Sequence, residues 1–208
     1  MNDNQHIIIC VGRQLGSGGH DIARMLALDF GAKYYDQELL NLAAKESGFS
    51  EKFFEQNDEK KGFLKGLFNI GSPHVNSGSV YNSSISQESL FKFQSDAVIK
   101  AANQGSCVFV GRCADYVLRD RTNVVSVFIT ASMDFRIEQI MAKQQLDKPL
   151  ARKYIEQHEA QRAAYYNYYT GKKWGCAESY DLCIDTSVLG LQATEHFIVD
   201  FIRKRFRL

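Results

Sequence analysis

The sequence lacks a large excess of charge of either sign. Its 25 lysine and arginine residues nearly balance its 24 aspartate and glutamate residues, so the net charge is only +1. Because no overall field favours nucleic acid or an anionic membrane, any anion-binding site must be local. We therefore expect neither nucleic acid nor a membrane as a partner.

Long apolar segments and paired cysteine motifs are also missing. No apolar stretch reaches the roughly 18 residues that a membrane helix needs, and the N-terminal "MNDNQHIII" has no basic region and no long apolar core. The five cysteines are odd in number and form no C-x-x-C pair. We expect reduced, mostly packed thiols without a metal site, in a cytoplasmic protein.

What is present suits one domain over residues 1–208, with 45% hydrophobic and 24% charged residues. Short, continuous apolar runs predict strands that are covered on both faces, at 6–11, 107–111, 123–130 and 181–185, with a fifth at 32–36. Helical patterns lie at 19–30, 36–47, 86–104, 132–145, 150–168 and 190–206. This alternation predicts an α/β fold: a five-stranded parallel sheet with helices on both faces and the strand at 7–11 in its centre.

The stretch "VGRQLGSGGHD" (11–21) resembles a phosphate-binding loop without its lysine. A P-loop has the pattern G-x-x-x-x-G-K-[ST], in which backbone N–H groups surround phosphate, lysine reaches the outer phosphates and the hydroxyl holds magnesium. Anchoring the pattern on Gly18 puts Arg13 at its first glycine. It also puts Gly19 at the lysine and His20 at the hydroxyl residue.

Four small residues in this stretch favour phosphate binding: Gly16, Ser17, Gly18 and Gly19. They follow a predicted strand and open a predicted helix, where free N–H groups and the helix dipole converge. The alternative is an ordinary tight turn between strand and helix. Four small residues in a row exceed what such a turn needs, so we favour the phosphate site.

The missing lysine has an energetic cost, because one charge-assisted hydrogen bond contributes about 1.5–3 kcal/mol. Arg13 and His20 are the nearby candidates to replace it. Arg13 stays charged, whereas a histidine at a helix start tends to be neutral. The alternative role for Arg13 is a surface salt bridge.

Two further charged residues follow predicted strands, on the side of the sheet where ligands of open α/β folds bind. Arg112 comes just after the run at 107–111, and Asp36 follows "KYY". Asp36 is also a candidate N-cap for the next helix. Asp36 or Asp21 is a candidate to orient magnesium through water, and no residue is predicted to bind the metal directly.

Two segments are unusual in composition. Residues 69–86, "NIGSPHVNSGSVYNSSIS", predict a mobile loop, and Ser84 with Gln87 is a possible capping box for the helix that follows. The tyrosine-rich stretch at 161–175 either binds nucleic acid by stacking or forms a packed helix with a basic turn, and the packed helix is the commoner case. The basic "RKRFR" (203–207) complements the dipole at a helix end.

Several blocks in this order resemble the cytidylate kinase-like branch of the nucleoside monophosphate kinases. They are "GSGGHDIARMLALDFGAKYYD", "VGRCADYVL", "FITASMDFRIEQIM" and "YDLCIDTSVLGLQA". The resemblance implies a three-layer P-loop kinase fold, ATP and Mg²⁺ as cofactors, and a nucleotide or small phosphorylated metabolite as ligand. It also implies a helical insert at about 37–104 and a helical lid at about 147–173.

The resemblance carries over to some site residues and not to others. Cytidylate kinases have a lid motif R-D-x-x-D-x-x-R, and here "IEQHEAQR" keeps Glu159 and Arg162 in kind but has lost the first arginine. Arg152, one helical turn earlier, is a substitute. The family pattern G-R-D after the third strand is "GRC" here, so Arg112 is kept and Cys113 replaces an aspartate that recognises cytosine.

Two functions remain open from the sequence. One is an ATP-dependent kinase that places Arg13, Arg112 and Arg162 around the transferred phosphoryl group. The other is a regulatory protein that binds a nucleotide or another anion without phosphoryl transfer. The lost lysine, hydroxyl and lid arginine favour the second, while the kept arginines and the glycine-dense loop favour the first. The acceptor and the oligomeric state are not determined.

Overall fold

Five parallel strands form one sheet at the centre of the protein. The computed structural model describes residues 6–36 and 87–208, and within them the strand order is β2-β3-β1-β4-β5. The strands are β1 (Ile8–Arg13), β2 (Lys33–Tyr35), β3 (Cys107–Val110), β4 (Val124–Thr130) and β5 (Leu182–Asp185). Each coincides with a predicted run, and the strand predicted as central is β1, which pairs with β3 and β4.

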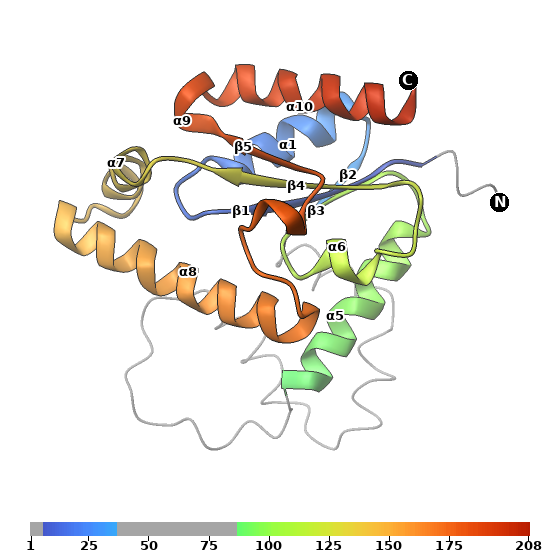
Figure 1. Ribbon diagram of the computed structural model, residues 1–208, viewed down its shortest axis with the longest axis horizontal. Coiled ribbons are helices and arrows are strands. Elements are labelled where there is room, and N and C mark those ends of the chain that lie inside the picture. The colour runs from blue at the N-terminus through green and yellow to red at the C-terminus, as the bar shows by residue number, and fades with distance from the viewer. Residues whose placement is uncertain (1–5, 37–86) are drawn as a thin grey trace.

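Helices cover both faces of this sheet, as predicted (Figure 1). α1 and α10 lie on one face, and α5 and α6 lie on the other. The helices are α1 (Gly19–Asp29), α5 (Gln87–Ala102), α6 (Ala114–Val117), α7 (Met133–Gln144), α8 (Lys148–Thr170), α9 (Thr186–Leu189) and α10 (Leu191–Phe206), with a 3₁₀ turn at Ala177–Ser179.

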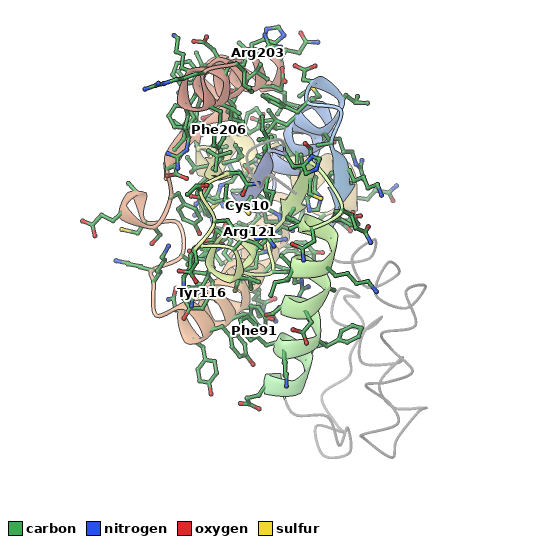
Figure 2. All side chains as sticks on the ribbon, turned by 90° about the vertical axis from the view of Figure 1, so that its right-hand side faces the viewer. Cys10, Phe91, Tyr116, Arg121, Arg203 and Phe206 are labelled. Carbon is green, nitrogen blue, oxygen red and sulfur yellow. The ribbon has the colours of Figure 1, made fainter. Side chains whose placement is uncertain are left out.

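The two-sided burial of β1 explains its unbroken apolar sequence. Alternate side chains of a strand point to opposite faces. Ile8 and Cys10 accordingly pack with α5 and α6, while Ile9 and Val11 pack with α1 and α10. Figure 2 shows Cys10 in the middle layer, between Phe206 on the α10 side and Phe91 on the α5 side. A polar residue at any of these β1 positions would therefore be buried.

Capping residues set the ends of α8, which is longer than the predicted 150–168. The Asp147 side chain accepts a hydrogen bond from the N–H of Leu150 at 2.9 Å, which satisfies one open amide of the first turn. At the other end, Gly171 adopts a left-handed conformation and its N–H donates to the carbonyl of Asn167. The tyrosine-rich stretch thus forms a packed helix followed by a turn, as favoured from the sequence.

Some predictions fall outside the described residues. They are the helix at 36–47 beyond Asp36, the loop at 69–86, the cap at Ser84 and most of the insert at 37–104. Three short elements were not predicted, namely α6, α9 and the 3₁₀ turn, because three or four residues are too few to show a helical period.

The remaining composition-based expectations concern cysteines, membrane spans and the basic C-terminus. All five cysteines are free thiols, and Cys10, Cys107 and Cys113 are buried. Among the described helices, none has the length and apolarity that crossing a membrane would require. At the basic end of α10, Arg205 pairs with Asp181 at 3.2 Å.

A buried carboxyl group lies between α10 and α1. Glu195 is only 4% exposed, although it is charged in the unfolded chain at neutral pH. Burial and the neighbouring Asp29 carboxylate raise the pKa of Glu195, whereas His196 and Arg203 act in the opposite direction. The folded protein therefore binds a proton at Glu195 more tightly than the unfolded chain does.

We expect Glu195→Gln to stabilise the protein at alkaline pH and not at acidic pH. Stability that depends on a carboxyl with a raised pKa is highest below the unfolded value, and it falls as the pH rises through the folded value. Glutamine cannot ionise, so the midpoint of thermal unfolding should rise at about pH 8 and change little at about pH 4. Asp200→Asn, on the exposed side of the same helix, is the control. An equal loss of stability at both pH values would contradict the prediction.

Candidate functional site

The loop between β1 and α1 needs its glycines for both conformation and space. Gly16 and Gly18 have left-handed φ angles of +83° and +75°. A Cβ atom on Gly16 would come within 2.7 Å of the carbonyl oxygen of Arg136, and one on Gly18 would collide with the side chain of Leu191. The loop is therefore held closely between α7 and the start of α10.

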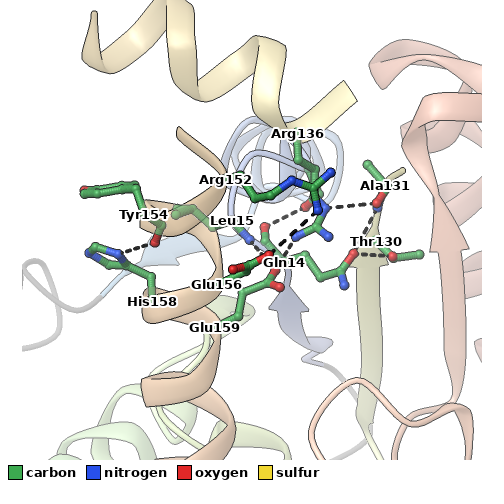
Figure 3. Close-up of polar contacts among 11 residues, drawn as sticks. Gln14, Leu15, Thr130, Ala131, Arg136, Arg152, Tyr154, Glu156, His158 and Glu159 are labelled. Atoms are coloured by element: carbon green, nitrogen blue, oxygen red, sulfur yellow. Dashed lines mark hydrogen bonds and ion pairs between the residues drawn. The ribbon is translucent and has the colours of Figure 1, made fainter. Parts of the chain in front are cut away.

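Hydrogen bonds hold this loop to the protein, and Figure 3 shows those between Gln14, Thr130 and Ala131. The side-chain oxygen of Gln14 accepts from the hydroxyl of Thr130 and from the N–H of Ala131. The Ser17 hydroxyl donates to the carbonyl of Gln14 at 2.9 Å, and the Thr186 hydroxyl donates to the carbonyl of Ser17 at 2.9 Å. With these carbonyl oxygens occupied, an anion that approaches the loop meets less electrostatic repulsion.

The N-terminus of α1 points out of the same loop. The helix begins at Gly19, its N-cap is Gly18, and no described side chain caps it. The carbonyl of Gly18 accepts from the N–H groups of Asp21 and Ile22, so the helix itself is well formed from its first turn. A well-formed but uncapped helix start leaves N–H groups and a positive dipole end that can bind an anion.

The side chain of Arg13 runs from the end of β1, past the start of α1, to the end of β3. Its Cβ lies 2.5 Å from the position that a Cβ on Gly19 would occupy. Its Nη1 lies 2.5 Å from the corresponding position on Gly111. Among the described residues Arg13 forms no salt bridge, so the surface ion pair considered from the sequence is not observed.

His20 is held in one neutral form by its two neighbours. The Nη2 of Arg13 lies 3.1 Å from Nε2 of His20, and guanidinium groups only donate, so Nε2 accepts. The proton is then on Nδ1, which donates to the Tyr34 hydroxyl at 3.0 Å. Burial and the adjacent Arg13 lower the pKa of His20 to about 4. The imidazole is therefore uncharged at neutral pH, as expected from its place at a helix start.

Arg112 sits in a strained turn after β3. Gly111, Arg112 and Cys113 have successive φ angles of +75°, +59° and +54°. A non-glycine residue in this conformation costs about 1–3 kcal/mol, and such strain is concentrated at functional sites. The turn brings the guanidinium carbon of Arg112 to 5.8 Å from the ring centroid of Tyr165 on α8. The strained turn thus holds the positive charge of Arg112 in a specific place beside Tyr165.

The three predicted arginines Arg13, Arg112 and Arg162 come together. Burial lowers the pKa of all three, and the other two cations lower that of Arg13 further, to about 9. All three remain charged at neutral pH. Within residues 6–36 and 87–208, the Nε of Arg13 and the Nη1 of Arg162 are buried without a hydrogen-bond partner. We call these three residues the arginine cluster, and its unsatisfied donors are suited to an anionic ligand.

The two predicted lid residues outside the cluster have other partners (Figure 3). Arg152 pairs with Glu156 at 3.7 Å, and both side chains are half exposed. Glu159 accepts from the Nη1 of Arg136 at 2.5 Å and from the N–H of Leu15 at 3.3 Å. Glu159 therefore fastens α8 to the glycine loop, and through α8 it holds Arg162 at the cluster.

Asp21 and Asp36 were predicted to act on magnesium through water. Asp21 is exposed on the first turn of α1. Asp36 follows β2 and is close enough to raise the pKa of both Arg13 and His20. Among the described residues, no group of three or more acidic, histidine or cysteine side chains could hold a metal. Since Arg13 and Tyr34 occupy both nitrogens of His20, residue 20 does not fit a magnesium ligand.

Sequence reasoning missed Arg136, which organises the contact between the loop and α8. Its side chain is only 5% exposed, and its Nε donates to the carbonyl of Ala131 at 3.0 Å. A signal existed, because Arg136 lies on the buried face of α7 beside Ile137 and Ile140. A charged residue on the apolar face of a helix indicates a buried partner.

Comparisons with known proteins agree with this fold. A family model described as the cytidylate kinase-like family matches residues 8–188. No curated protein matches the chain. A crystal structure of an uncharacterized protein from Eubacterium ventriosum is 27% identical, with a TM-score of 0.71 over 94% of this chain and 98% of that chain.

Shikimate kinases share the fold at lower similarity. The enzyme from Bacteroides thetaiotaomicron is 11% identical, with a TM-score of 0.53 over 97% of this chain and 99% of that chain. The enzyme from Acinetobacter baumannii, solved with shikimate, is 10% identical, with a TM-score of 0.51 over 97% and 95%. At these identities the likeness shows the fold alone.

We expect Arg136→Met to destabilise the protein by about 3–5 kcal/mol, because it leaves the largely buried Glu159 carboxylate without its cation. Thermal or denaturant unfolding measures the loss. The control is Lys148→Met, which removes an ion pair with Asp134 whose side chains are 66% and 77% exposed. That exposed pair should contribute less than about 1 kcal/mol. Equal effects of the two variants would argue against a fastening role for Glu159.

We also expect His20 to stay neutral, with its proton on Nδ1, between about pH 5 and pH 8. Long-range proton–nitrogen correlation NMR distinguishes the two tautomers and the charged form. In Arg13→Met, the pKa of His20 should move toward its ordinary value, because a nearby cation and a fixed donor are removed. A His20 that titrates normally in the unmodified protein would refute this arrangement.

Proposed function

Because the chain belongs to the cytidylate kinase-like family, we propose that it is an ATP-dependent phosphotransferase. Its acceptor is a nucleoside monophosphate or a related small phosphorylated metabolite. The observation that carries this proposal is the arginine cluster beside the uncapped start of α1. Phosphoryl transfer asks little covalent work of a protein, and it depends on positioning and on neutralising charge.

The donor phosphates bind at the glycine loop. Backbone N–H groups of Gly16 and of Gly18 to His20, together with the dipole of α1, hold the outer phosphates of ATP. Ser17 keeps the loop in shape, because both its N–H and its hydroxyl donate to the carbonyl of Gln14. Arg13 lies directly beside this helix start and supplies a full positive charge. Mg²⁺ accompanies the nucleotide and offsets phosphate charge, and residue 20 does not hold it.

The acceptor binds on the α5 side of the cluster. Arg112 projects from its strained turn toward Tyr165, whose hydroxyl donates to the buried Gln94 of α5 at 3.1 Å. Phe91 of α5 stacks on Tyr169 with ring centroids 4.1 Å apart. A cation beside aromatic rings suits a flat, anionic acceptor such as a nucleotide.

α8 acts as the lid in this proposal, over the predicted range 147–173. It supplies Arg162 to the transferred phosphoryl group, while Glu159 keeps the helix fastened to the loop. Farther along α8, the Tyr166 hydroxyl donates to Asp115 at 2.7 Å. Several contacts thus hold the lid over the cluster, where exclusion of water strengthens every charge interaction.

A second function has an observation in its favour. Residue 20, where a P-loop holds magnesium, is engaged with Arg13 and Tyr34, and the turn after β3 carries an arginine and a cysteine rather than a carboxylate. Such a site suits a regulatory protein that binds a nucleotide or another anion and transfers nothing. Both functions require anion binding, and only the first requires turnover.

A paired binding and turnover assay separates the two functions. We expect ATP to raise the unfolding temperature, by mass action on the folded state. Phosphorus NMR with ATP, Mg²⁺ and a panel of nucleoside monophosphates should then detect ADP only with the correct acceptor. Binding of ATP without turnover across the panel would support the regulatory protein. Absence of any ATP or pyrophosphate binding would refute the phosphotransferase, and absence of binding to every nucleotide and inorganic anion tested would refute both.

Within the enzyme, Arg162→Met should lower kcat/KM by about 10- to 100-fold, the equivalent of one charge-assisted hydrogen bond of about 1.5–3 kcal/mol. The loss should fall mainly on kcat, because Arg162 is proposed to contact the transferred group. Arg119→Met is the control, because Arg119 is half exposed near α6 and its contacts among the described residues are local, to Tyr116 and Asp120. Equal rates in the Arg162 variant and the control would contradict the role of Arg162.

A further inference from the structure

The position of the missing lysine is already filled by another side chain. Gly19 stands where the P-loop pattern has lysine. A Cβ atom there would lie 2.5 Å from Cβ and 3.0 Å from Cγ of Arg13. Real Cβ atoms do not approach other heavy atoms so closely, so residue 19 can carry no side chain while Arg13 is in this place.

Backbone conformation does not explain the glycine at position 19. It lies within α1 and is not among the residues with a positive φ angle. The clearance that Arg13 needs is therefore the physical reason for glycine here. Gly111 gives the same clearance at the far end, against Nη1 of Arg13.

The residue at the metal-binding position supports the same arginine. His20 accepts from Nη2 of Arg13 and donates to Tyr34, so neither ring nitrogen remains for a cation. The guanidinium is held by His20 through Nη2, while its Nε is buried and has no hydrogen-bond partner among the described residues. A braced, charged fork with an unused donor is suited to a phosphate oxygen.

We propose that Arg13 supplies the positive charge that a lysine at position 19 supplies in a P-loop. Arg13 stands in the lysine's space, and His20 braces Arg13 instead of holding magnesium, so the loop binds a triphosphate without a metal ligand at residue 20. The proposal rests on the proposed function only in requiring that the loop bind ATP phosphates.

A double-mutant cycle measured by thermal unfolding tests, without any ligand, whether Arg13 has exchanged places with a side chain at position 19. Gly19→Ala should lower the unfolding temperature of the unmodified protein, because the new Cβ meets Arg13. In an Arg13→Gly background the same Gly19→Ala change should be neutral or stabilising. An equal loss in both backgrounds overturns the exchange, whether or not the protein binds ATP.

Isothermal titration with ATP, once in EDTA and once in excess Mg²⁺, tests the metal part. The two dissociation constants of the unmodified protein should agree within about threefold. Binding that is more than about threefold tighter with Mg²⁺ would overturn the proposal while leaving the proposed function intact. No ATP binding in either buffer would refute the proposed function itself, and the unfolding cycle would still decide the exchange.

The swapped variant gives an independent check. In EDTA, Arg13→Gly should weaken ATP binding at least about tenfold, as expected for loss of a charged hydrogen bond. Arg13→Gly combined with Gly19→Lys should recover most of that affinity, because a lysine then fills the vacated space. Arg119→Ala is the control and should bind ATP as the unmodified protein does. Failure of the swap to recover affinity in a folded protein would count against the exchange.

Discussion

Three like charges held together in partly buried positions are the constraint on which the rest of this structure depends. Arg13, Arg112 and Arg162 repel one another, and burial removes the water that would otherwise screen them. Only a rigid frame can keep such groups together in the absence of an anion. The sheet supplies two of them, because Val11 of β1 pairs with Val110 of β3 and each arginine follows two residues later.

Hydrogen bonds and one ion pair hold the elements around the cluster in fixed positions. Gln14 and Thr186 tie the glycine loop to β4 and α9, and the Arg136–Glu159 pair ties the same loop to α7 and α8. Each contact involves a partly or fully buried group, whose loss would expose an unpaired donor or acceptor to an apolar interior. Strain at Arg112 is maintained in the same way, since the surrounding packing outweighs its backbone cost.

Much of the sheet and part of the arginine cluster were predictable from the amino-acid sequence. Unbroken apolar runs such as "IIICV" arise because β1 is buried on both faces, and the same pattern holds for β3 and β4. Residues that end strands on one edge of a parallel sheet must lie near one another, so Arg13 and Arg112 could be paired without coordinates. Arg136 was missed because its partner Glu159 lies 23 residues away on another helix, and no local pattern links the two.

The sequence by itself determined the α/β class, the order of elements and the glycine-dense turn, because hydrophobic period and small residues are local properties. It also shows glycine at position 19, where the P-loop pattern has lysine. Only the tertiary structure decided that Arg13 runs past this glycine, because the path of Arg13 between Gly19 and Gly111 depends on the distance between α1 and the end of β3. That distance is set by packing across the sheet, which no stretch of sequence encodes alone.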